Sequence, residues 1–416
     1  MAREYKDSGI EWIGQIPKEW EVCPHKHIMF KKKEIQEHYA GQDIISLTMN
    51  GVVVRDLDAG GKMPLSFDGY QIIYPNNLLL CLFDIDVTPR CVGLINNYGV
   101  TSPAYSQFVV KEKGYPPYYD YLLRYMDDHK CLLHLSKNLR SSLTETDFGQ
   151  IKTCIPPYTE QQKIADYLDK VCGEVDEMVA LQETMIEELK AYKQSVITEA
   201  VTKGLNPNVP MKDSGIDWIR EIPENWKVIR IKYLLKERKE RSDTGLEEPL
   251  SMSQKYGLIP TKEMDAIPNI ASSFVGAKLV YRHDLVFNKL KAHLGVFAES
   301  DYDGLVSPDY AVYYSSGLVD VKYLEYLFKS PQYIAEFIKL STGVGAGLTR
   351  LYTSDLYSIY GIVPPIEIQR EIVDYIRQLS SEINTLIAIK QSKIEELKEY
   401  KKSVIYEYVT GKKEVV

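Results

Sequence analysis

The side chains best suited to contact another molecule in this sequence are hydrogen-bond donors that stand beside turn residues. Asparagine and glutamine suit the edge of adenine, whereas arginine and lysine suit guanine or phosphate. These donors are therefore candidate DNA contacts, with a solvated surface charge as the alternative interpretation at each position. The candidates are Thr48, Asn50, Arg55, Arg90, Lys137, Asn138, Arg140, Ser253, Gln254, Lys255, Asn288, Lys289, Lys291, His293, Thr349 and Arg350.

Residue patterns typical of catalysis are missing from the sequence. It contains no P-loop, no HExxH and no GxSxG motif. The carboxylate pairs Asp84/Asp86 and Asp301/Asp303 lie in turn-like contexts, where solvated charge is expected. The six cysteines show no CxxC spacing and no histidine cluster nearby, which favours reduced thiols over a zinc site. We therefore predict no catalytic residue and no metal site in this chain.

The tetrapeptide Ile155-Pro-Pro-Tyr158 has the spacing of the (Asn/Asp)-Pro-Pro-(Tyr/Phe) motif of amino methyltransferases. That motif needs an amide or carboxylate at its first position to accept a hydrogen bond from the target amine, and isoleucine has neither. The sequence also lacks a glycine-rich loop after a strand that could hold S-adenosylmethionine. The chain by itself is therefore expected to be neither a methyltransferase nor a nuclease.

Two long helical patterns must position the candidate loops. Residues 155–204 and 363–412 align without a gap at an offset of 208 residues and share the pattern IEELKxYKxSVIxExVT. Each copy opens with Pro-Pro, after which a helix can begin but through which it cannot run. Apolar residues then recur at alternating steps of three and four, which predicts that the two helices pair as a coiled coil. The predicted seam is Ile164, Leu168, Val171, Val175, Met178, Met185, Leu189, Tyr192 and Val196, with Ile372, Ile376, Leu379, Ile383, Leu386, Leu397, Tyr400 and Val404.

A second repeat precedes each globular segment. The motif KDSGIEWIGQIPKEWEV at residues 6–22 recurs as KDSGIDWIREIPENWKV at 212–228, with 11 of 17 positions identical. The four tryptophans of the chain lie at matching places in these motifs, which indicates packing anchors, with base stacking as the alternative. The chain is thus a tandem of motif, globular segment and helix. We predict a first domain at 1–154, a helix at 155–204, a second domain at 205–362, and a second helix with a tail at 363–416.

The two globular segments are mixed in character. Each begins with strand-like runs and then becomes helical, at Tyr118–Met126 and at Val321–Phe328. The sequence therefore predicts an α+β fold, with two mixed α/β domains joined by two long antiparallel helices and a pseudo-two-fold internal repeat. The predicted strands are Asp43–Leu47, Gly51–Val54, Tyr70–Tyr74, Leu78–Phe83, Gln107–Val110, Lys278–Tyr281, Leu285–Phe287 and Ala311–Tyr314.

Composition sets the class of protein and the location of its charge. The 416 residues are 44% apolar and 26% charged, and no apolar run reaches the length of a membrane span. With no signal segment at the N-terminus, we predict a cytoplasmic protein without a membrane partner. The net charge is −8, and residues 155–204 carry five basic and ten acidic side chains. Residues 23–154 are neutral, which permits a basic face on that domain.

The whole pattern resembles the specificity subunit of type I restriction-modification systems. The resemblance rests on the KDSGIxWIxxIPxxW motifs, the PPxxxQ helix starts and the shared helix ends, and it covers the whole chain. It implies two target-recognition domains that read a bipartite sequence in double-stranded DNA, and two conserved helices that dock two modification subunits, to which restriction subunits add. It also implies that S-adenosylmethionine, ATP and magnesium belong to those partner subunits, and that this chain carries no cofactor. The alternative is a coiled-coil adaptor with two heads that do not bind DNA.

Overall fold

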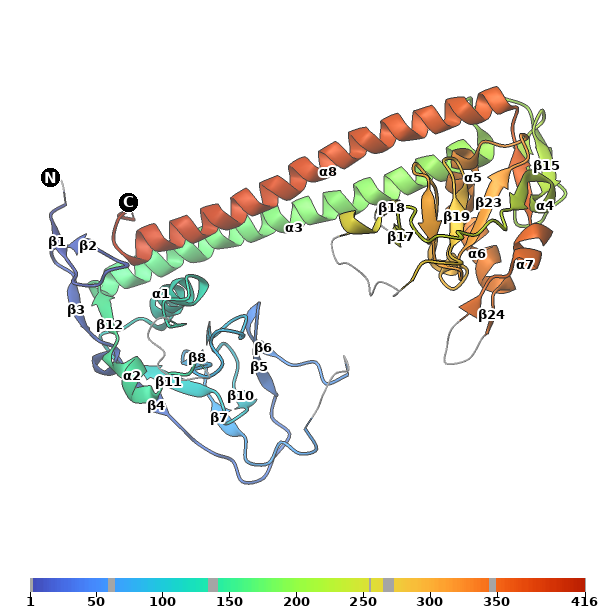
Figure 1. The fold of residues 1–416 in the computed structure, drawn as a ribbon. Helices are drawn as coiled ribbons and strands as arrows, with labels where there is room; N and C mark the ends of the chain where they lie inside the picture. The colour runs from blue at the N-terminus through green and yellow to red at the C-terminus, as the bar shows by residue number, and fades with distance from the viewer. Residues whose placement is uncertain are drawn as a thin grey trace. The chain divides into compact units, whose positions relative to one another are not determined.

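Two compact units make up the chain in the computed structural model, which describes residues 3–58, 64–133, 141–253, 256–264, 273–343 and 349–415. Unit 1 comprises Met1–Glu183 and Gln391–Val416, and unit 2 comprises Thr184–Lys390. Each unit contains a globular domain and part of each of two long helices, α3 (Tyr158–Lys203) and α8 (Ile366–Val409) (Figure 1). The mixture of long helices with antiparallel strands is the predicted α+β class.

The domain of unit 1 is built on a four-stranded antiparallel sheet with the order β4-β11-β8-β9. The hairpin β5–β6 packs on the edge strand β9, because Gly93 has no side chain to displace Val52; a Cβ at Gly93 would lie 2.7 Å from Val52 Cγ2. The strands are β4 (Met29–Lys32), β5 (Ile45–Thr48), β6 (Gly51–Val54), β7 (Gln71–Ile73), β8 (Leu78–Leu80), β9 (Val92–Leu94), β10 (Gly99–Thr101) and β11 (Ser106–Val110), followed by α1 (Pro116–Asp128) and α2 (Glu145–Gln150).

The domain of unit 2 has a four-stranded sheet of the same connectivity, β16-β23-β20-β21. Its hairpin β17–β18 packs against the edge strand β21. The elements are β16 (Leu235–Glu237), β17 (Leu250–Ser253), β18 (Gly257–Pro260), β19 (Lys278–Val280), β20 (Leu285–Phe287), β21 (Phe297–Glu299), β22 (Gly304–Val306), β23 (Ala311–Ser315), α5 (Val321–Phe328), α6 (Pro331–Leu340), β24 (Thr342–Gly343), β25 (Thr349–Arg350) and α7 (Thr353–Ser358).

Short elements connect each domain to the long helices. In unit 1, β1 pairs with β2 and β3 pairs with β12; in unit 2, β13 pairs with β14 and β15 pairs with β26. All strands and both domain helices predicted from the sequence are present, within three residues at either end. The connecting elements are β1 (Tyr5–Asp7), β2 (Gln15–Pro17), β3 (Glu21–Pro24), η1 (His25–His27), β12 (Lys152–Ile155), β13 (Met211–Asp213), β14 (Glu221–Pro223), β15 (Lys227–Arg230), α4 (Ile231–Leu234) and β26 (Tyr360–Val363), while η3 (Thr261–Glu263) and η4 (Ala292–Leu294) lie within the second domain.

The repeated tryptophan motifs dock against the ends of the long helices. Trp20 and Trp226 are buried, which confirms the prediction of packing anchors for this pair. In unit 1, Gly411 follows the end of α8, where φ is +70° and a Cβ would lie 2.9 Å from the Trp20 ring. In unit 2, Gly204 has φ of +85° and the equivalent place beside Trp226. Glycine is required at both helix ends because of the left-handed backbone and the close approach of the indole.

The PPxxxQ motifs fasten each long helix to its domain. Gln161 is buried; its Oε1 accepts from the Tyr115 amide (2.7 Å), and its Nε2 donates to the Lys113 and Pro156 carbonyls. Gln369 repeats this arrangement in unit 2, where its Oε1 accepts from the Asp320 amide (2.8 Å). Each glutamine satisfies backbone groups just before the domain helix, and an apolar residue would leave them buried and unpaired.

The two long helices lie antiparallel within each unit. In unit 1, Lys401 Nζ lies 2.6 Å from Asp176 Oδ1, and the rings of Tyr167 and Tyr408 are 4.5 Å apart. In unit 2, Lys193 Nζ donates to Asn384 Oδ1 (3.1 Å). Lys401 and Lys193 are 208 residues apart, as are Asn384 and Asp176. Both units therefore pair their helices in the same register.

The buried line along each helix differs in part from the predicted seam. Leu168, Val175, Ile376, Ile383 and Val404 are buried as predicted. Met178, Met185, Tyr192, Leu386 and Tyr400 are exposed instead, and this part of the predicted seam is corrected. The observed line continues through Cys172, Val179, Gln182, Ile186, Lys193, Ile387, Lys390, Ile394 and Lys401. Lysine and glutamine can hold these positions because their aliphatic stems pack while their polar ends reach outward.

Candidate nucleic-acid interface

The tip of the β5–β6 hairpin carries two of the candidate contacts in unit 1. Thr48 Oγ1 donates to the Gly51 carbonyl (3.0 Å) and accepts from the Asn50 amide (3.2 Å), which fixes the turn. The Asn50 side chain is exposed at the tip. Arg124 Nη2, from α1, lies 3.6 Å from where a Cβ at Gly51 would be. A cationic group from the domain helix therefore supports the turn that presents Thr48 and Asn50.

Arg90 lies in an ion-pair cluster between the β8–β9 connection and α1. Its Nη1 is 3.0 Å from Asp128 Oδ1 and 3.9 Å from Asp127 Oδ2, while the Cys91 amide donates to Asp127 (2.8 Å). Burial raises the pKa of the neighbouring Asp120 carboxyl, and Arg124, at 2.8 Å, lowers it in part. The cluster holds the β8–β9 connection on α1, so Arg90 reaches a ligand only by giving up this pairing.

Three cationic side chains converge in unit 2. The Leu351 amide donates to the Lys289 carbonyl (3.0 Å), which brings the segment at Arg350 beside the segment that follows β20. Burial lowers the pKa of the Lys289 ammonium, and the positive charges of Lys278 and Arg350 lower it further. Two carboxylates lie close to these cations, Glu237 at 3.4 Å from Lys278 and Asp309 at 3.6 Å from Arg350. A phosphate oxygen is a suitable ligand for such a group.

The remaining candidate residues lie at several places in the two domains. Asn288 Oδ1 accepts from the Leu290 amide (3.1 Å), so it shapes the turn after β20. Lys291 is exposed, and His293 lies on η4. Thr349 pairs with Gly343 in the short β24–β25 ladder, and Ser253 ends β17. Arg55 follows β6, where its amide donates to the Ile44 carbonyl (2.7 Å). Lys137, Asn138, Arg140, Gln254 and Lys255 lie outside the described residues.

Two cations beside the candidate residues were not predicted from the sequence. Arg124 lies within a helix whose residues are mostly buried, and Lys278 begins an apolar strand, so neither stood out as a candidate contact in the sequence. Lys278 could have been recognised by comparing the two halves, because the matching strand of unit 1 begins with the uncharged Gln71 where unit 2 has a lysine. Gln71 is buried and its Nε2 donates to the Ser102 (2.9 Å) and Tyr105 carbonyls, whereas Lys278 points its charge toward Glu237. The two domains therefore share a fold and differ in charge at equivalent positions.

The paired helices expose apolar side chains on one face, here called the exposed stripe. In a heptad written with a and d in the seam, these residues occupy the g and c positions of both helices. The g positions of antiparallel partners lie on the same side of the pair, so within each unit the residues share one face. The stripe is Met178, Leu181 and Tyr400 in unit 1, and Met185, Tyr192, Leu386 and Ile389 in unit 2. Leu181 is 56% exposed and Ile389 is 60% exposed.

Exposed leucine and isoleucine in one stripe on an otherwise charged helix face make this face a candidate for binding another chain. The glutamates around the stripe pair mainly within their own helix, as Glu187 does with Lys190 (2.7 Å) and Glu396 with Lys393 (3.1 Å). Such exposed pairs contribute little to stability. No helix among the described residues is long and apolar enough to cross a membrane. Within the same residues, no group of three or more histidine, cysteine or acidic side chains could hold a metal ion.

Comparison of the sequence with known proteins gives distant relatives. No protein-family model matches the chain. It is 26% identical over 324 residues to the putative type I restriction enzyme MjaX specificity subunit of Methanocaldococcus jannaschii, across 73% of this chain and 69% of that protein. It is 24% identical over 281 residues to the type I restriction enzyme MjaVIII specificity subunit of the same organism, across 64% of this chain and 63% of that protein.

Comparison of the fold gives closer similarity over nearly the whole chain. A chain from a structure concerned with complex assembly and conformational transition of the type I R-M system aligns with a TM-score of 0.70 and 14% identity, covering 95% of this chain and 98% of the other. The HsdS subunit from Thermoanaerobacter tengcongensis aligns with a TM-score of 0.55 and 15% identity, with the same coverage. At these identities the likeness concerns the fold.

Proposed function

We propose that this chain, which belongs to the specificity-subunit family of type I restriction-modification systems, reads a bipartite sequence in double-stranded DNA. One half-site is read by residues 1–154 and the other by residues 205–362. The chain is not catalytic alone. Modification and restriction subunits supply the chemistry, with S-adenosylmethionine, ATP and magnesium bound by those partners. A cytoplasmic location follows from this role.

The observation that carries the proposal is the common register of the helix pair in the two units. Lys193–Asn384 and Lys401–Asp176 are equivalent contacts, 208 residues apart. We infer from this that α3 and α8 form one antiparallel coiled coil over 155–204 and 363–412, with a pseudo-two-fold axis near the middle. Duplex DNA has the same kind of axis. Two readers related in this way would meet half-sites about one helical turn apart, roughly 34–36 Å, with an unread spacer between them.

Within each reader, we propose that the first edge-strand hairpin and the connection after the central strand contact DNA. In the first domain these carry Thr48 and Asn50, supported by Arg124. In the second, Lys278, Lys289 and Arg350 hold a backbone phosphate, because convergent cations suit that anion. The two domains share a fold but carry different side chains at equivalent positions. This difference in charge supports the proposal that they read different half-sites.

The exposed stripe is the proposed docking face for the modification subunits. It lies in both units at equivalent positions, which suits two copies of one partner. Leu181→Glu combined with Ile389→Glu should abolish co-elution with the modification subunit in size-exclusion chromatography. Lys190→Glu combined with Lys398→Glu, which changes charge on the same helices away from the stripe, is the control. Loss of co-elution in the control alone would contradict the assignment.

The experiment that tests the function is sequencing of methylated bases in a host that expresses this chain with its modification subunit. The proposal expects one bipartite methylated motif that disappears when this chain is deleted. A variant with residues 23–154 exchanged for the corresponding segment of another family member should change one half-site only. The adaptor alternative would leave methylation unaffected and would show no sequence preference in a gel shift with the modification subunit present.

A further inference from the structure

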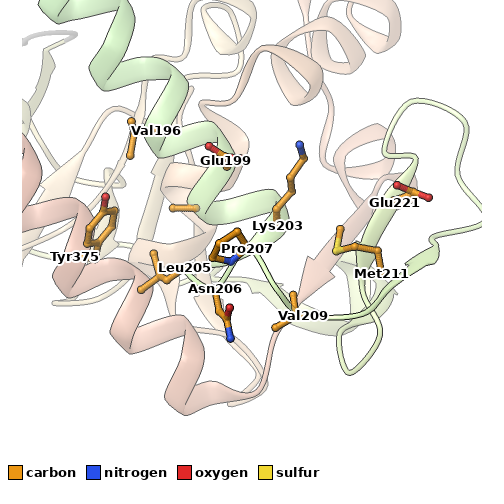
Figure 2. A pocket seen from close by; sticks show the side chains of 12 residues that line it. Val196, Glu199, Lys203, Leu205, Asn206, Pro207, Val209, Met211, Glu221 and Tyr375 are labelled. Atoms are coloured by element: carbon orange, nitrogen blue, oxygen red, sulfur yellow. The ribbon is translucent and has the colours of Figure 1, made fainter.

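Unit 2 contains a hollow of about 500 Å³ where α3 passes into the segment that leads to β13 (Figure 2). Val196, Glu199, Ala200 and Lys203 of α3 form one wall, and residues 204–211 form another. Tyr375 of α8 closes a third side. The volume is within the range of ordinary ligand pockets. The side chains of Leu205, Met211 and Tyr375 remain 42%, 37% and 41% exposed around it.

The equivalent place in unit 1 contains a pair of aromatic rings. Tyr408 stands 208 residues after Ala200, and Tyr167 stands 208 residues before Tyr375. The rings of Tyr167 and Tyr408 lie 4.5 Å apart, and Val415 of the C-terminal tail packs against the core of unit 1. Ala200 offers only a methyl group at the position of the Tyr408 ring. The two units therefore differ at this place: unit 1 has a tyrosine ring where unit 2 has a methyl group beside the hollow.

The rim of the hollow carries charge that its own unit does not neutralise. Glu199, Lys203 and Glu221 are exposed, and none of the three makes an ion pair with any residue that the structure describes. Two carboxylates against one ammonium leave the rim acidic. The lining is mixed, with apolar side chains from Val196, Ala200 and Leu205 beside the charged rim, so the matching ligand is an apolar side chain flanked by a basic residue.

The hollow also lies on the helix face that carries the exposed stripe. Glu199 follows Tyr192 by one heptad on α3, and Tyr375 precedes Ile389 by two heptads on α8. A helix that covers Tyr192 and Ile389 would therefore meet the hollow at its end. In unit 1 the ring of Tyr408 stands at the position of Ala200, so the same helix would meet a tyrosine there in place of the open side of Ala200.

We propose that the hollow of unit 2 receives a large apolar side chain of the modification subunit that docks on the exposed stripe. The two modification subunits then bind unequally, with the tighter site on unit 2. This inference rests on the proposed function, because it assumes that two modification subunits dock on the helix pair. A ring or branched aliphatic group buried in one site and absent from the other gives a difference of about tenfold in Kd, or more.

The test is stepwise titration of the full-length chain with the modification subunit of its own system, followed by native mass spectrometry and calorimetry. The wild-type chain should bind two subunits with Kd values at least about tenfold apart. Ala200→Tyr introduces in unit 2 the ring that unit 1 has. It should raise the Kd of the tighter step to that of the weaker step. Met211→Ser alters only an exposed rim residue, and it should weaken the same step without affecting folding. Tyr408→Ala opens unit 1 and should tighten the weaker step.

The outcomes separate this inference from the proposed function. Two equal steps in the wild-type chain, or unchanged steps in both Ala200→Tyr and Met211→Ser, would overturn the inference while leaving DNA reading and docking in place. Absence of any complex would overturn the docking assignment itself. Thermal unfolding of each variant, monitored by circular dichroism, checks that a weakened step does not come from a misfolded helix end.

Discussion

His25 makes unit 1 sensitive to acid through its burial. The side chain is fully buried on η1, its ring lies 4.7 Å from the Phe148 ring, and neither ring nitrogen has a hydrogen-bond partner among the described residues. Desolvation lowers the pKa of His25 from 6.5 to about 4, and the Phe148 backbone offsets only part of this shift. A neutral imidazole is compatible with this position, whereas an imidazolium would be an unpaired buried charge.

The sign and size of the effect follow from linkage. Between pH 6.5 and about 4 the unfolded chain binds a proton at this histidine and the folded chain does not, so stability falls as the pH falls. Over the whole interval of about 2.5 pKa units the loss is about 3 kcal/mol, and between pH 7 and pH 5 it is about 2 kcal/mol. Well below pH 4, where both states bind the proton, the contribution of His25 no longer changes.

The assay is hydrogen exchange measured by mass spectrometry on the full-length chain, corrected for intrinsic exchange rates, in peptides that cover β11 and α2. Protection of these peptides should drop between pH 7 and pH 5 in the wild-type chain. His25→Leu removes the titrating group and should flatten the drop by about 2 kcal/mol. His27→Leu, on the exposed side of the same short helix, should keep the wild-type slope. An unchanged slope in His25→Leu would refute the reasoning.

Three further predictions concern the attachment of α8 to its domain, the spacer between the half-sites, and DNA contact. Gln369→Leu should destabilise unit 2 by about 2–3 kcal/mol in denaturant unfolding, because the Asp320 amide and the Pro364 carbonyl lose their buried partner, whereas the exposed Gln378→Leu should be near neutral. If the length of the helix pair sets the distance between the two half-sites, one heptad inserted after residue 183 and another after residue 391 lengthens the pair by about 10 Å. The methylated motif should then gain about three base pairs of spacer, with both half-sites kept. An unchanged spacer would contradict the idea that helix length sets the spacer. Lys289→Ala should weaken DNA binding by the complex and reduce the slope of log Kd against log salt by about one, and a salt slope equal to wild type would remove Lys289 from the phosphate contacts.

Much of the architecture was present in local patterns of the sequence. The Pro-Pro starts and the shared helix ends placed α3 and α8 to within a few residues, because proline excludes a helix upstream and apolar periodicity extends over many turns. The repeated tryptophan motifs predicted two docked segments, and burial of Trp20 and Trp226 agrees with that prediction. The strands β9 and β10 were missed because each contains a glycine, which weakens a strand pattern in the sequence.

The phase of the helix seam depended on tertiary packing. Met178 and Tyr192 are more apolar than Lys193 and Gln182, yet the lysine and the glutamine lie in the buried line and the methionine and the tyrosine do not. A side chain's polarity does not fix its position when its stem can pack and its end can reach solvent. The apolar residues that lie outside the buried line form the exposed stripe. Apolar periodicity in the sequence does not distinguish these residues from those of the core.

The sequence by itself determined that the chain is a tandem of two similar halves with long helices, because repetition and periodicity are local properties. Only the tertiary structure decided which charges meet, since Arg350 is far from Lys278 and Lys289 in the chain and the hydrogen bond from the Leu351 amide to the Lys289 carbonyl brings it beside them. It also decided that the halves are unequal at their helix ends. The two halves differ at equivalent positions, with Ala200 in one and Tyr408 in the other. This difference lies beside a hollow only in unit 2, where the neighbouring segments leave space unfilled.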